Sequence, residues 1–241
     1  MTPNASAVQA VIFDLDGTLV DTNDAHVEAW LAAFRDFGYH VPRSRILPEI
    51  GKGGDKLVPS ILGEDSDEQD GEALRNAHGR HFVTMAKDSI FRVFPATEDL
   101  LSELRRRSIA TAVATSSTKA HLNATRASSG LDLDRLVDHI VTGGPSLDSK
   151  PAPDLIQAAL EKLASAPQLT LMIGDTPHDG EASARAGVPF LGLLCGGRPP
   201  DDLSRAEPWR SMRIRPTCSA TSRRLSISAP ESLSNVRGPA R

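Results

Sequence analysis

The sequence predicts an α/β protein: a Rossmann-like parallel sheet core with helices on both faces, interrupted by an inserted all-helical cap domain. Short apolar runs rich in β-branched residues alternate with helix-like segments, as βαβ units require. One long stretch after the first run is helical throughout and breaks the alternation. The 241 residues suffice for one domain core and a smaller accessory domain.

Five runs have the length and composition of buried strands. The first, residues 8–13, is nearly all apolar and ends shortly before Gly17, which is typical of a strand buried on both faces of a parallel sheet. The predicted strands are residues 8–13, 109–114, 140–141, 169–173 and 188–194, and the predicted core helices are residues 96–107, 119–128, 153–164 and 178–186. Together they predict a catalytic core formed by residues 1–20 and 95–204.

Residues 21–94 carry helical periodicity but no strand run, and we interpret them as the helical cap. Its predicted helices are residues 26–37, 56–62 and 68–87. Between the first two of these, Gly51-Lys52-Gly53-Gly54 predicts a flexible turn, because glycine relieves the backbone of steric limits.

Residues 205–241 are rich in arginine, serine and proline and sustain neither period, so we expect an irregular, disordered basic tail. Such a tail can touch nucleic acid, but a solvated appendage is the preferred interpretation. The formal net charge of −4 excludes a basic field over the whole surface. No nucleic-acid or membrane partner is therefore predicted, and a small molecule is favoured.

The chain has two cysteines, no signal-like amino terminus and no apolar segment of the roughly 20 residues that span a bilayer. These features predict a cytoplasmic protein. We expect a monomer or a weak homodimer.

Four polar fragments follow predicted strands, where a doubly wound sheet places its ligand site. In the first, Asp14 and Asp16 are two residues apart, so in extended backbone both face the same side. Their repulsion requires a dication or a raised pKa on one of them, which predicts an ionised nucleophile and a proton carrier. The alternative is a pair of turn or cap aspartates.

The second and third fragments offer phosphate ligands. Thr115 and Ser116 precede a predicted helix, where hydroxyl and backbone N–H groups seat a phosphate, although both residues are also ordinary helix caps. Lys150 stands beside prolines that stiffen its loop, and its ammonium can neutralise both a phosphate and an approaching carboxylate. The alternative is a surface lysine at a helix entrance.

The fourth fragment holds Asp175 and Asp179. Magnesium prefers hard oxygen ligands and needs only one or two carboxylates beside a substrate phosphate. Asp175 is the better direct ligand, and Asp179 is expected on a water or on the lysine. An acidic helix cap is the alternative interpretation.

Together, these four fragments resemble the motifs of the haloacid dehalogenase-like hydrolase superfamily, in its branch of helical-cap phosphoglycolate phosphatases and β-phosphoglucomutases. The resemblance covers about residues 8–204. It implies that Asp14 attacks phosphorus and that Asp16 protonates the leaving alkoxide and then activates water. The dehalogenases of the family lack an acid at the position of Asp16, because a leaving halide needs no proton.

The resemblance also implies ligand sets. Thr115, Ser116 and Lys150 would bind the phosphoryl oxygens. Asp14, Asp175 and the backbone carbonyl of Asp16 would hold Mg²⁺, the predicted cofactor, with Asp179 behind them.

Three cap or loop residues carry weaker expectations. The turn with Lys52 is similar to the specificity loop of phosphoglycolate phosphatases, so Lys52 would meet the far end of the substrate, unless it is a surface lysine. His26 lies one helical turn before Trp30. Related mutases have a similar histidine, which implies contact between His26 and the substrate, but a pair buried in the core of the cap is the preferred interpretation. For His178, a solvent-facing helix start is preferred over contact with the site.

The predicted function is a magnesium-dependent phosphatase that acts on a small phosphorylated metabolite resembling phosphoglycolate, through an aspartyl phosphate. A phosphosugar mutase of the same fold is the alternative. The family normally continues after residues 196–203 into a strand and a helix, which the tail does not supply. Our hypothesis for this difference is a shifted reading frame or a degenerate terminus. Two alternatives come from other classes of function: an inactive binding protein with a damaged C-terminus, and a nucleic-acid-associated protein that uses the tail.

Overall fold

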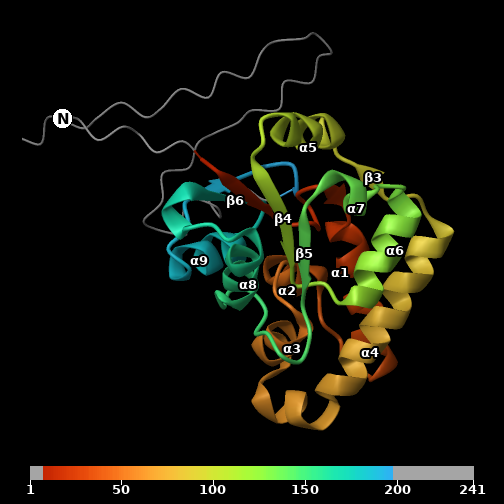
Figure 1. Ribbon diagram of the computed structural model, residues 1–241. Helices are drawn as coiled ribbons and strands as arrows, with labels where there is room; N and C mark the ends of the chain where they lie inside the picture. The colour runs from red at the N-terminus through yellow and green to blue at the C-terminus, as the bar shows by residue number, and fades with distance from the viewer. Residues whose placement is uncertain (1–7, 198–241) are drawn as a thin grey trace, which may run out of the picture.

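A five-stranded parallel sheet forms the centre of the molecule, in the order β5-β4-β1-β6-β7 (Figure 1). The computed structural model describes residues 8–197. The strands are β1 (Ala10–Phe13), β4 (Ala110–Thr115), β5 (His139–Thr142), β6 (Thr170–Gly174) and β7 (Phe190–Gly192). This confirms the predicted fold class. The strand order reverses at β1, so the carboxyl end of β1 lies where open α/β sheets bind their ligands.

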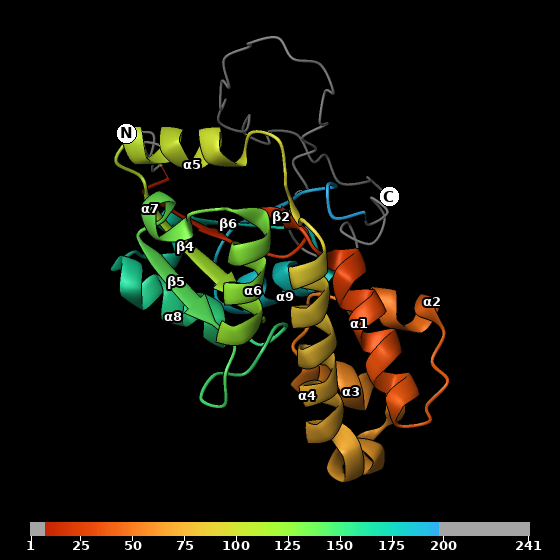
Figure 2. The same ribbon diagram turned by 90° about the vertical axis from the view of Figure 1, so that its right-hand side faces the viewer.

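Helices cover both faces of the sheet because successive side chains of its strands point to opposite sides (Figures 1 and 2). Val11 and Phe13 belong to an apolar cluster with α5 (Thr97–Arg106), α6 (Lys119–Ser129) and α7 (Leu133–Leu136). Ile12 belongs to the cluster on the other face, under α8 (Asp154–Leu163) and α9 (Pro177–Arg185). The short 3-10 helix η2 (Pro167–Leu169) leads into β6.

A group of helices lies beside the carboxyl edge of the sheet (Figure 2). It consists of α1 (Asn23–Asp36), α2 (Arg43–Ile46), η1 (Leu47–Glu49), α3 (Gly54–Leu62) and α4 (Glu64–Asp88). These helices have a separate apolar cluster that includes Trp30, Phe34 and Leu57. Phe82, near the end of α4, instead joins the cluster of the sheet. The division into a core of residues 1–20 and 95–204 and a cap of residues 21–94 stays a prediction.

The expectation that residues 21–94 contain no strand is wrong. Val20–Asp21 (β2) pairs antiparallel with Arg92–Val93 (β3), where the chain enters and leaves the helical group. An ion pair of 2.9 Å between Arg92 and Asp21 accompanies this pairing. Strands of two residues are too short to show a period in the sequence. The short helices α2 and α7 were not predicted either, because four residues are too few to show a helical period.

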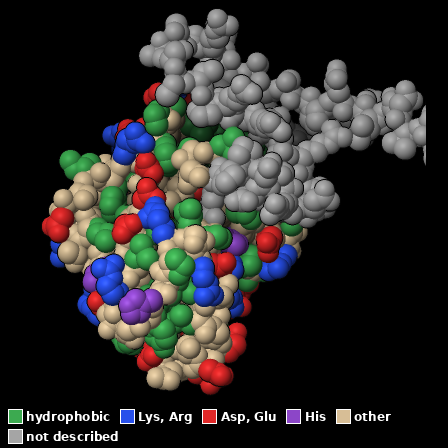
Figure 3. Space-filling view, turned by 180° about the vertical axis from the view of Figure 1, so that it is seen from behind, with side chains coloured by type: hydrophobic (Ala, Val, Ile, Leu, Met, Phe, Trp, Pro, Cys, Tyr) green, Lys and Arg blue, Asp and Glu red, His purple; other side chains and the backbone are tan. Residues whose placement is uncertain are grey.

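The face in Figure 3 presents acidic, basic and apolar side chains interspersed among one another. No helix in the part of the chain that the structure describes is both long enough and apolar enough to cross a membrane. The predicted basic tail, residues 205–241, lies outside the described residues.

Candidate functional site

The polar fragments of the sequence meet at the carboxyl edge of the sheet. Asp14 directly follows β1, Thr115 is the last residue of β4, and Asp175 directly follows β6. Parallel pairing holds the ends of these strands level, with Phe13 opposite both Val113 and Ile173. The structure therefore brings the first, second and fourth fragments together, as the strand ends predicted.

Lys150 lies at the centre of the site and is completely buried. Its Nζ donates to Oδ1 of Asp14 and to Oδ1 of Asp179, each at 2.6 Å. Burial lowers the pKa of this ammonium, but the two carboxylates outweigh burial and raise the pKa above its ordinary value. Lys150 is thus a fixed positive charge, and the alternative of a surface lysine is wrong.

Negative charge is in excess around this ammonium. Burial raises the pKa of Asp14 well above its ordinary value of 3.8; Lys150 lowers it, while Asp179, Asp175 and Asp16 raise it further. Four carboxylates thus lie near a single ammonium, which contacts two of them. A divalent cation relieves this kind of repulsion.

The donor set fits a magnesium ion. Carboxylate oxygens of Asp14, Asp175 and Asp179, all buried, lie within 4.8 Å of one another. Hard oxygen ligands of this kind are those that Mg²⁺ prefers. Asp179 is already bound to Lys150 and, through a capping box, to Thr176, so Asp14 and Asp175 are the better ligands. The predicted ligation by the backbone carbonyl of Asp16 stays a prediction.

Asp175 is held from two sides by residues near the start of the chain. Oδ1 accepts a hydrogen bond of 3.0 Å from Thr18, and Oδ2 accepts one of 2.8 Å from the amide of Asn23. Gly17 has a φ of +81°, and a Cβ there would lie 2.3 Å from both the amide nitrogen of Asn23 and Oδ2 of Asp175. Only glycine permits this close approach. No local pattern in the sequence links Thr18 or Asn23 to Asp175, so only the structure identifies these two residues.

The carboxylate of Asp16 points into a separate set of donors. Its Oδ1 accepts a 2.7 Å hydrogen bond from Thr22 and lies 3.3 Å from Nε2 of His26. Its Oδ2 accepts from the hydroxyls of Ser117 at 2.7 Å and Thr115 at 3.3 Å. Burial raises the pKa of Asp16, but His26 and the hydrogen bonds outweigh burial and hold it below its ordinary value. Asp16 is therefore stabilised as an anion in this arrangement.

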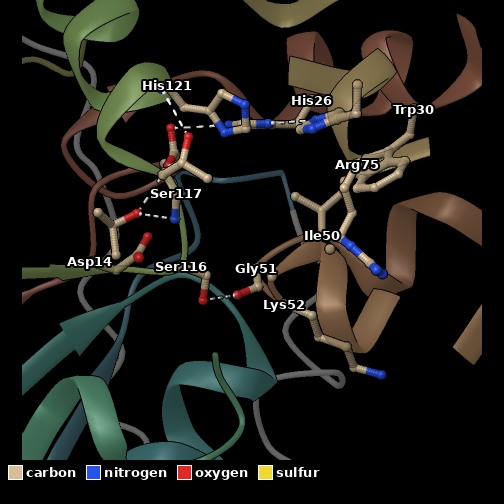
Figure 4. A pocket seen from close by; sticks show the side chains of 16 residues that line it. Asp14, His26, Trp30, Ile50, Gly51, Lys52, Arg75, Ser116, Ser117 and His121 are labelled. Atoms are coloured by element: carbon tan, nitrogen blue, oxygen red, sulfur yellow. Dashed lines mark hydrogen bonds and ion pairs between the residues drawn. The ribbon is translucent and has the colours of Figure 1, made fainter. Parts of the chain in front are cut away.

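Ser116 links the core to the loop between η1 and α3. Its hydroxyl donates to the carbonyl of Gly51 at 3.1 Å (Figure 4). It also accepts from the backbone N–H of Lys150 at 3.4 Å. One residue before Lys150, Ser149 accepts a 3.1 Å hydrogen bond from the backbone N–H of Gly53. Ser116 thus lies beside Lys150, another predicted phosphate ligand, and its hydroxyl is bonded to the loop.

The fourth fragment contacts η1, which directly precedes this loop. Nε2 of His178 lies 2.9 Å from the carbonyl oxygen of Pro48, to which it can donate. His178 is only 9% exposed, so the expectation of a solvent-facing histidine is wrong. Core residues from three fragments therefore hold η1 and the glycine-rich loop after it over the site.

Lys52 lines the cavity, but its charge is engaged elsewhere. Its ammonium pairs with the carboxylate of Glu49 and lies 3.4 Å from the hydroxyl of Ser60. Figure 4 shows the end of Lys52 directed away from Asp14. The structure thus places Lys52 at the cavity without placing its ammonium beside Asp14.

A cavity of about 110 Å³ opens between Asp14 and the helical group. Its wall includes aromatic and basic side chains from the helices (Figure 4). His26 and Trp30 were noted in the sequence, whereas Arg75, His78 and His121 were not. These residues come from α1, α4 and α6, so only the packing of these helices brings them together.

Comparisons with known proteins agree with this geometry. The family model described as haloacid dehalogenase-like hydrolase matches residues 11–193. The chain is 32% identical to the probable phosphatase IndB of Dickeya dadantii, covering 82% of this chain and 86% of that protein. It is 26% identical to the phosphoglycolate phosphatase of Escherichia coli K12, covering 78% and 82%. A hydrolase structure from Pseudomonas syringae superimposes with a TM-score of 0.72 at 28% identity, covering 82% and 89%.

The burial of His121 predicts that the free energy of unfolding depends on pH. Burial, together with the neighbouring His26, lowers the pKa of His121 from 6.5 to about 4, although Asp16 opposes the shift. The unfolded chain therefore binds a proton at this residue more readily than the folded protein. The stabilising effect is complete above pH 6.5 and is lost as the pH falls toward about 4.

We expect His121→Phe, which keeps an aromatic ring at the position, to make the free energy of unfolding less dependent on pH in this window. Denaturant titrations of both proteins across the window measure the difference. Parallel curves for the two proteins would contradict the assignment.

Proposed function

The chain belongs to the haloacid dehalogenase-like hydrolase family, and on this premise we propose that it is a magnesium-dependent phosphatase. It hydrolyses a small phosphorylated metabolite of the phosphoglycolate type through an aspartyl-phosphate intermediate. The observation that carries this proposal is the buried ammonium of Lys150 between Asp14 and Asp179, with Asp175 close by. Such an arrangement compensates the charge that opposes attack of a carboxylate on a phosphate.

Asp14 is the nucleophile because it lines the cavity while Lys150 holds one of its oxygens. In the first step, a carboxylate oxygen of Asp14 bonds to phosphorus as the bond from phosphorus to the ester oxygen breaks. The leaving alkoxide takes a proton from Asp16. In the second step, a water molecule gives a proton to Asp16 and attacks the phosphorus. The bond between phosphorus and the oxygen of Asp14 breaks, which releases inorganic phosphate and restores the carboxylate.

The hydroxyls around Asp16 serve both partners of the reaction. Thr115 and Ser117 stabilise the anionic form of Asp16, which is the form that accepts a proton from water. When Asp16 carries the proton for the leaving group, these hydroxyls become available to the phosphoryl oxygens. Ser116 and Lys150 supply further donors next to them.

Asp14, Asp175 and the backbone carbonyl of Asp16 would hold the magnesium ion, with Asp179 positioning Lys150 behind them. When bound, the ion supplies Lewis-acid stabilisation of the transferring oxygens. Asn23 and Thr18 orient Asp175 toward this task.

The phosphoglycolate type of substrate is supported by the loop and by the similarity to a relative named for that substrate. The loop with Lys52 lies over the cavity, which has the volume for a small organic acid phosphate. A substrate carboxylate would exchange places with Glu49 as the partner of Lys52. Because the loop contacts core residues on several sides, its closure also limits water around the reacting groups.

Asp14→Asn tests the nucleophile. We expect magnesium-dependent hydrolysis of p-nitrophenyl phosphate to fall by about three orders of magnitude or more, because an amide oxygen is a poor nucleophile. Asp99→Asn, the same substitution at an exposed position of α5, should retain full activity. Turnover by Asp14→Asn at the wild-type rate would contradict the mechanism.

A phosphosugar mutase must return the phosphoryl group to a sugar, whereas a phosphatase transfers it to water. We expect one inorganic phosphate released for each substrate consumed, with magnesium present, when phosphoglycolate or sugar monophosphates are supplied. Phosphate release and the remaining organic phosphate are measured in the same sample. Isomerised sugar phosphate without phosphate release would replace our proposal with the mutase.

Lys52→Met tests the loop. A hydrogen bond to a charged group contributes about 1.5–3 kcal/mol, so we expect KM for phosphoglycolate to rise by about tenfold or more. Hydrolysis of p-nitrophenyl phosphate, which has no carboxylate, should be almost unaffected. Equal effects on both substrates would exclude a specific contact between Lys52 and the carboxylate.

A further inference from the structure

His78 is a buried polar residue whose role the proposed mechanism leaves open. It lies in α4, is 5% exposed, and stacks on Trp30 with ring centroids 4.2 Å apart and an interplanar angle of 11°. Its Nε2 lies 3.2 Å from Nδ1 of His26. One edge of this ring thus meets the histidine that reaches Asp16.

His26 stands between His78 and the reaction centre. Its Nε2 lies 3.3 Å from Oδ1 of Asp16. The side chains of His78, His26 and Asp16 therefore form a continuous line of polar contacts, with His26, labelled in Figure 4, in the middle. The ring of His26 also stacks on Phe82, with centroids 4.0 Å apart and an interplanar angle of 11°. Stacking holds the plane of the ring.

Stacking cannot decide which edge of the ring faces Asp16. A half-turn of an imidazole about its bond to Cβ exchanges nitrogen and carbon positions while keeping the same plane, so the face against Phe82 is almost unchanged. The contact between Nδ1 and His78 distinguishes the two orientations, because the other orientation puts a carbon against Nε2 of His78. A buried nitrogen without a hydrogen-bond partner is unfavourable, so the observed orientation is preferred.

We propose that His78 is a positioning residue for the reaction, and that it holds His26 with Nε2 directed at Asp16. The inference rests on the proposed function, because it assigns His78 a part in proton transfer by Asp16. His78 has no hydrogen bond to Asp16 or to the predicted phosphate ligands among the described residues, and would act on Asp16 through His26.

The proton inventory of the pair agrees with this role. Burial lowers the pKa of His78 well below 6.5, and His26, His121 and His81 add to the shift, so His78 has one N–H and one acceptor nitrogen. If His78 donates to Nδ1 of His26, the proton of a neutral His26 must be on Nε2. In that arrangement His26 directs its N–H at Asp16, 3.3 Å away.

The consequence concerns the leaving group. Asp16 protonates an alkoxide, which is a poor leaving group, whereas p-nitrophenolate leaves readily without a proton. A misdirected His26 therefore impairs hydrolysis of an alkyl phosphate more than hydrolysis of p-nitrophenyl phosphate. A general loss of folding or of the metal site would reduce both reactions equally.

The experiment compares His78→Phe, His78→Gln and His81→Phe with the wild type. Phenylalanine keeps the stack on Trp30 but removes the ring nitrogens, while glutamine restores a polar group that can reach Nδ1 of His26. His81→Phe is the matched control, because His81 lies three residues further along α4, is partly exposed, and pairs with Asp36 at the surface. For each protein, kcat and KM are measured on p-nitrophenyl phosphate and on phosphoglycolate with magnesium.

We expect His78→Phe to lower kcat for the alkyl phosphate relative to that for p-nitrophenyl phosphate by on the order of tenfold, the size typical of a lost supporting contact behind a functional group. KM should change little, His78→Gln should recover much of the ratio, and His81→Phe should match the wild type. An unchanged ratio in an active His78→Phe protein would overturn the inference and leave the proposed function intact.

A second readout is independent of turnover. In protein labelled with ¹⁵N-histidine, the ring nitrogens of His26 should shift in His78→Phe and keep their wild-type positions in His81→Phe. If the wild type hydrolyses neither ester, the proposed function fails, and these resonances still test the contact. Identical His26 resonances in His78→Phe and wild type would show that His78 does not position the ring.

Discussion

A buried ammonium surrounded by carboxylates is the constraint around which the site is organised. Lys150 has no exposed surface and contacts both Asp14 and Asp179 at 2.6 Å. Removing one partner from such a pair typically costs about 3–5 kcal/mol, because a charge is left buried without compensation. The loop of Lys150, the end of β1 and the start of α9 must therefore keep their relative positions. Charge balance ties three distant parts of the chain to one point.

The parallel sheet makes this convergence possible. Because β1 pairs with β4 on one side and β6 on the other, residues that follow these strands meet at one edge. Asp175 is then oriented by Thr18 and Asn23, which belong to the segment that leads from β1 into α1. The segment that starts the helical group thus also orients a carboxylate at the edge of the sheet.

Contacts from the helical group complete the site in two places. The loop with Gly51 and Gly53 is bonded to Ser116 and Ser149 of the core, and His178 reaches the carbonyl of Pro48. On the other wall, His26 contacts both His78 of α4 and Asp16. The first set of contacts closes one side of the cavity, and the second reaches Asp16. In the proposed reaction, phosphate binding and proton transfer would both depend on the packing of these helices against the sheet.

The amino-acid sequence by itself determined the α/β class, the strands of the central sheet and the position of Asp14, Thr115 and Asp175 at strand ends. These features follow from local periods and from one rule, namely that parallel strands place their carboxyl ends at a common edge. The strands β2 and β3 could not be predicted, because two-residue strands carry no period and pair across residues distant in the chain.

The tertiary structure alone decided the partners of these residues. It buried Lys150 completely, buried His178 against the expectation of exposure, bonded Lys52 to Glu49, and gathered His78, His121 and Arg75 around the cavity. Burial, hydrogen bonding and pKa depend on the distances between residues far apart in sequence, and a sequence pattern contains none of these distances. Local chemistry therefore selected the reacting groups, whereas packing selected their orientation and charge.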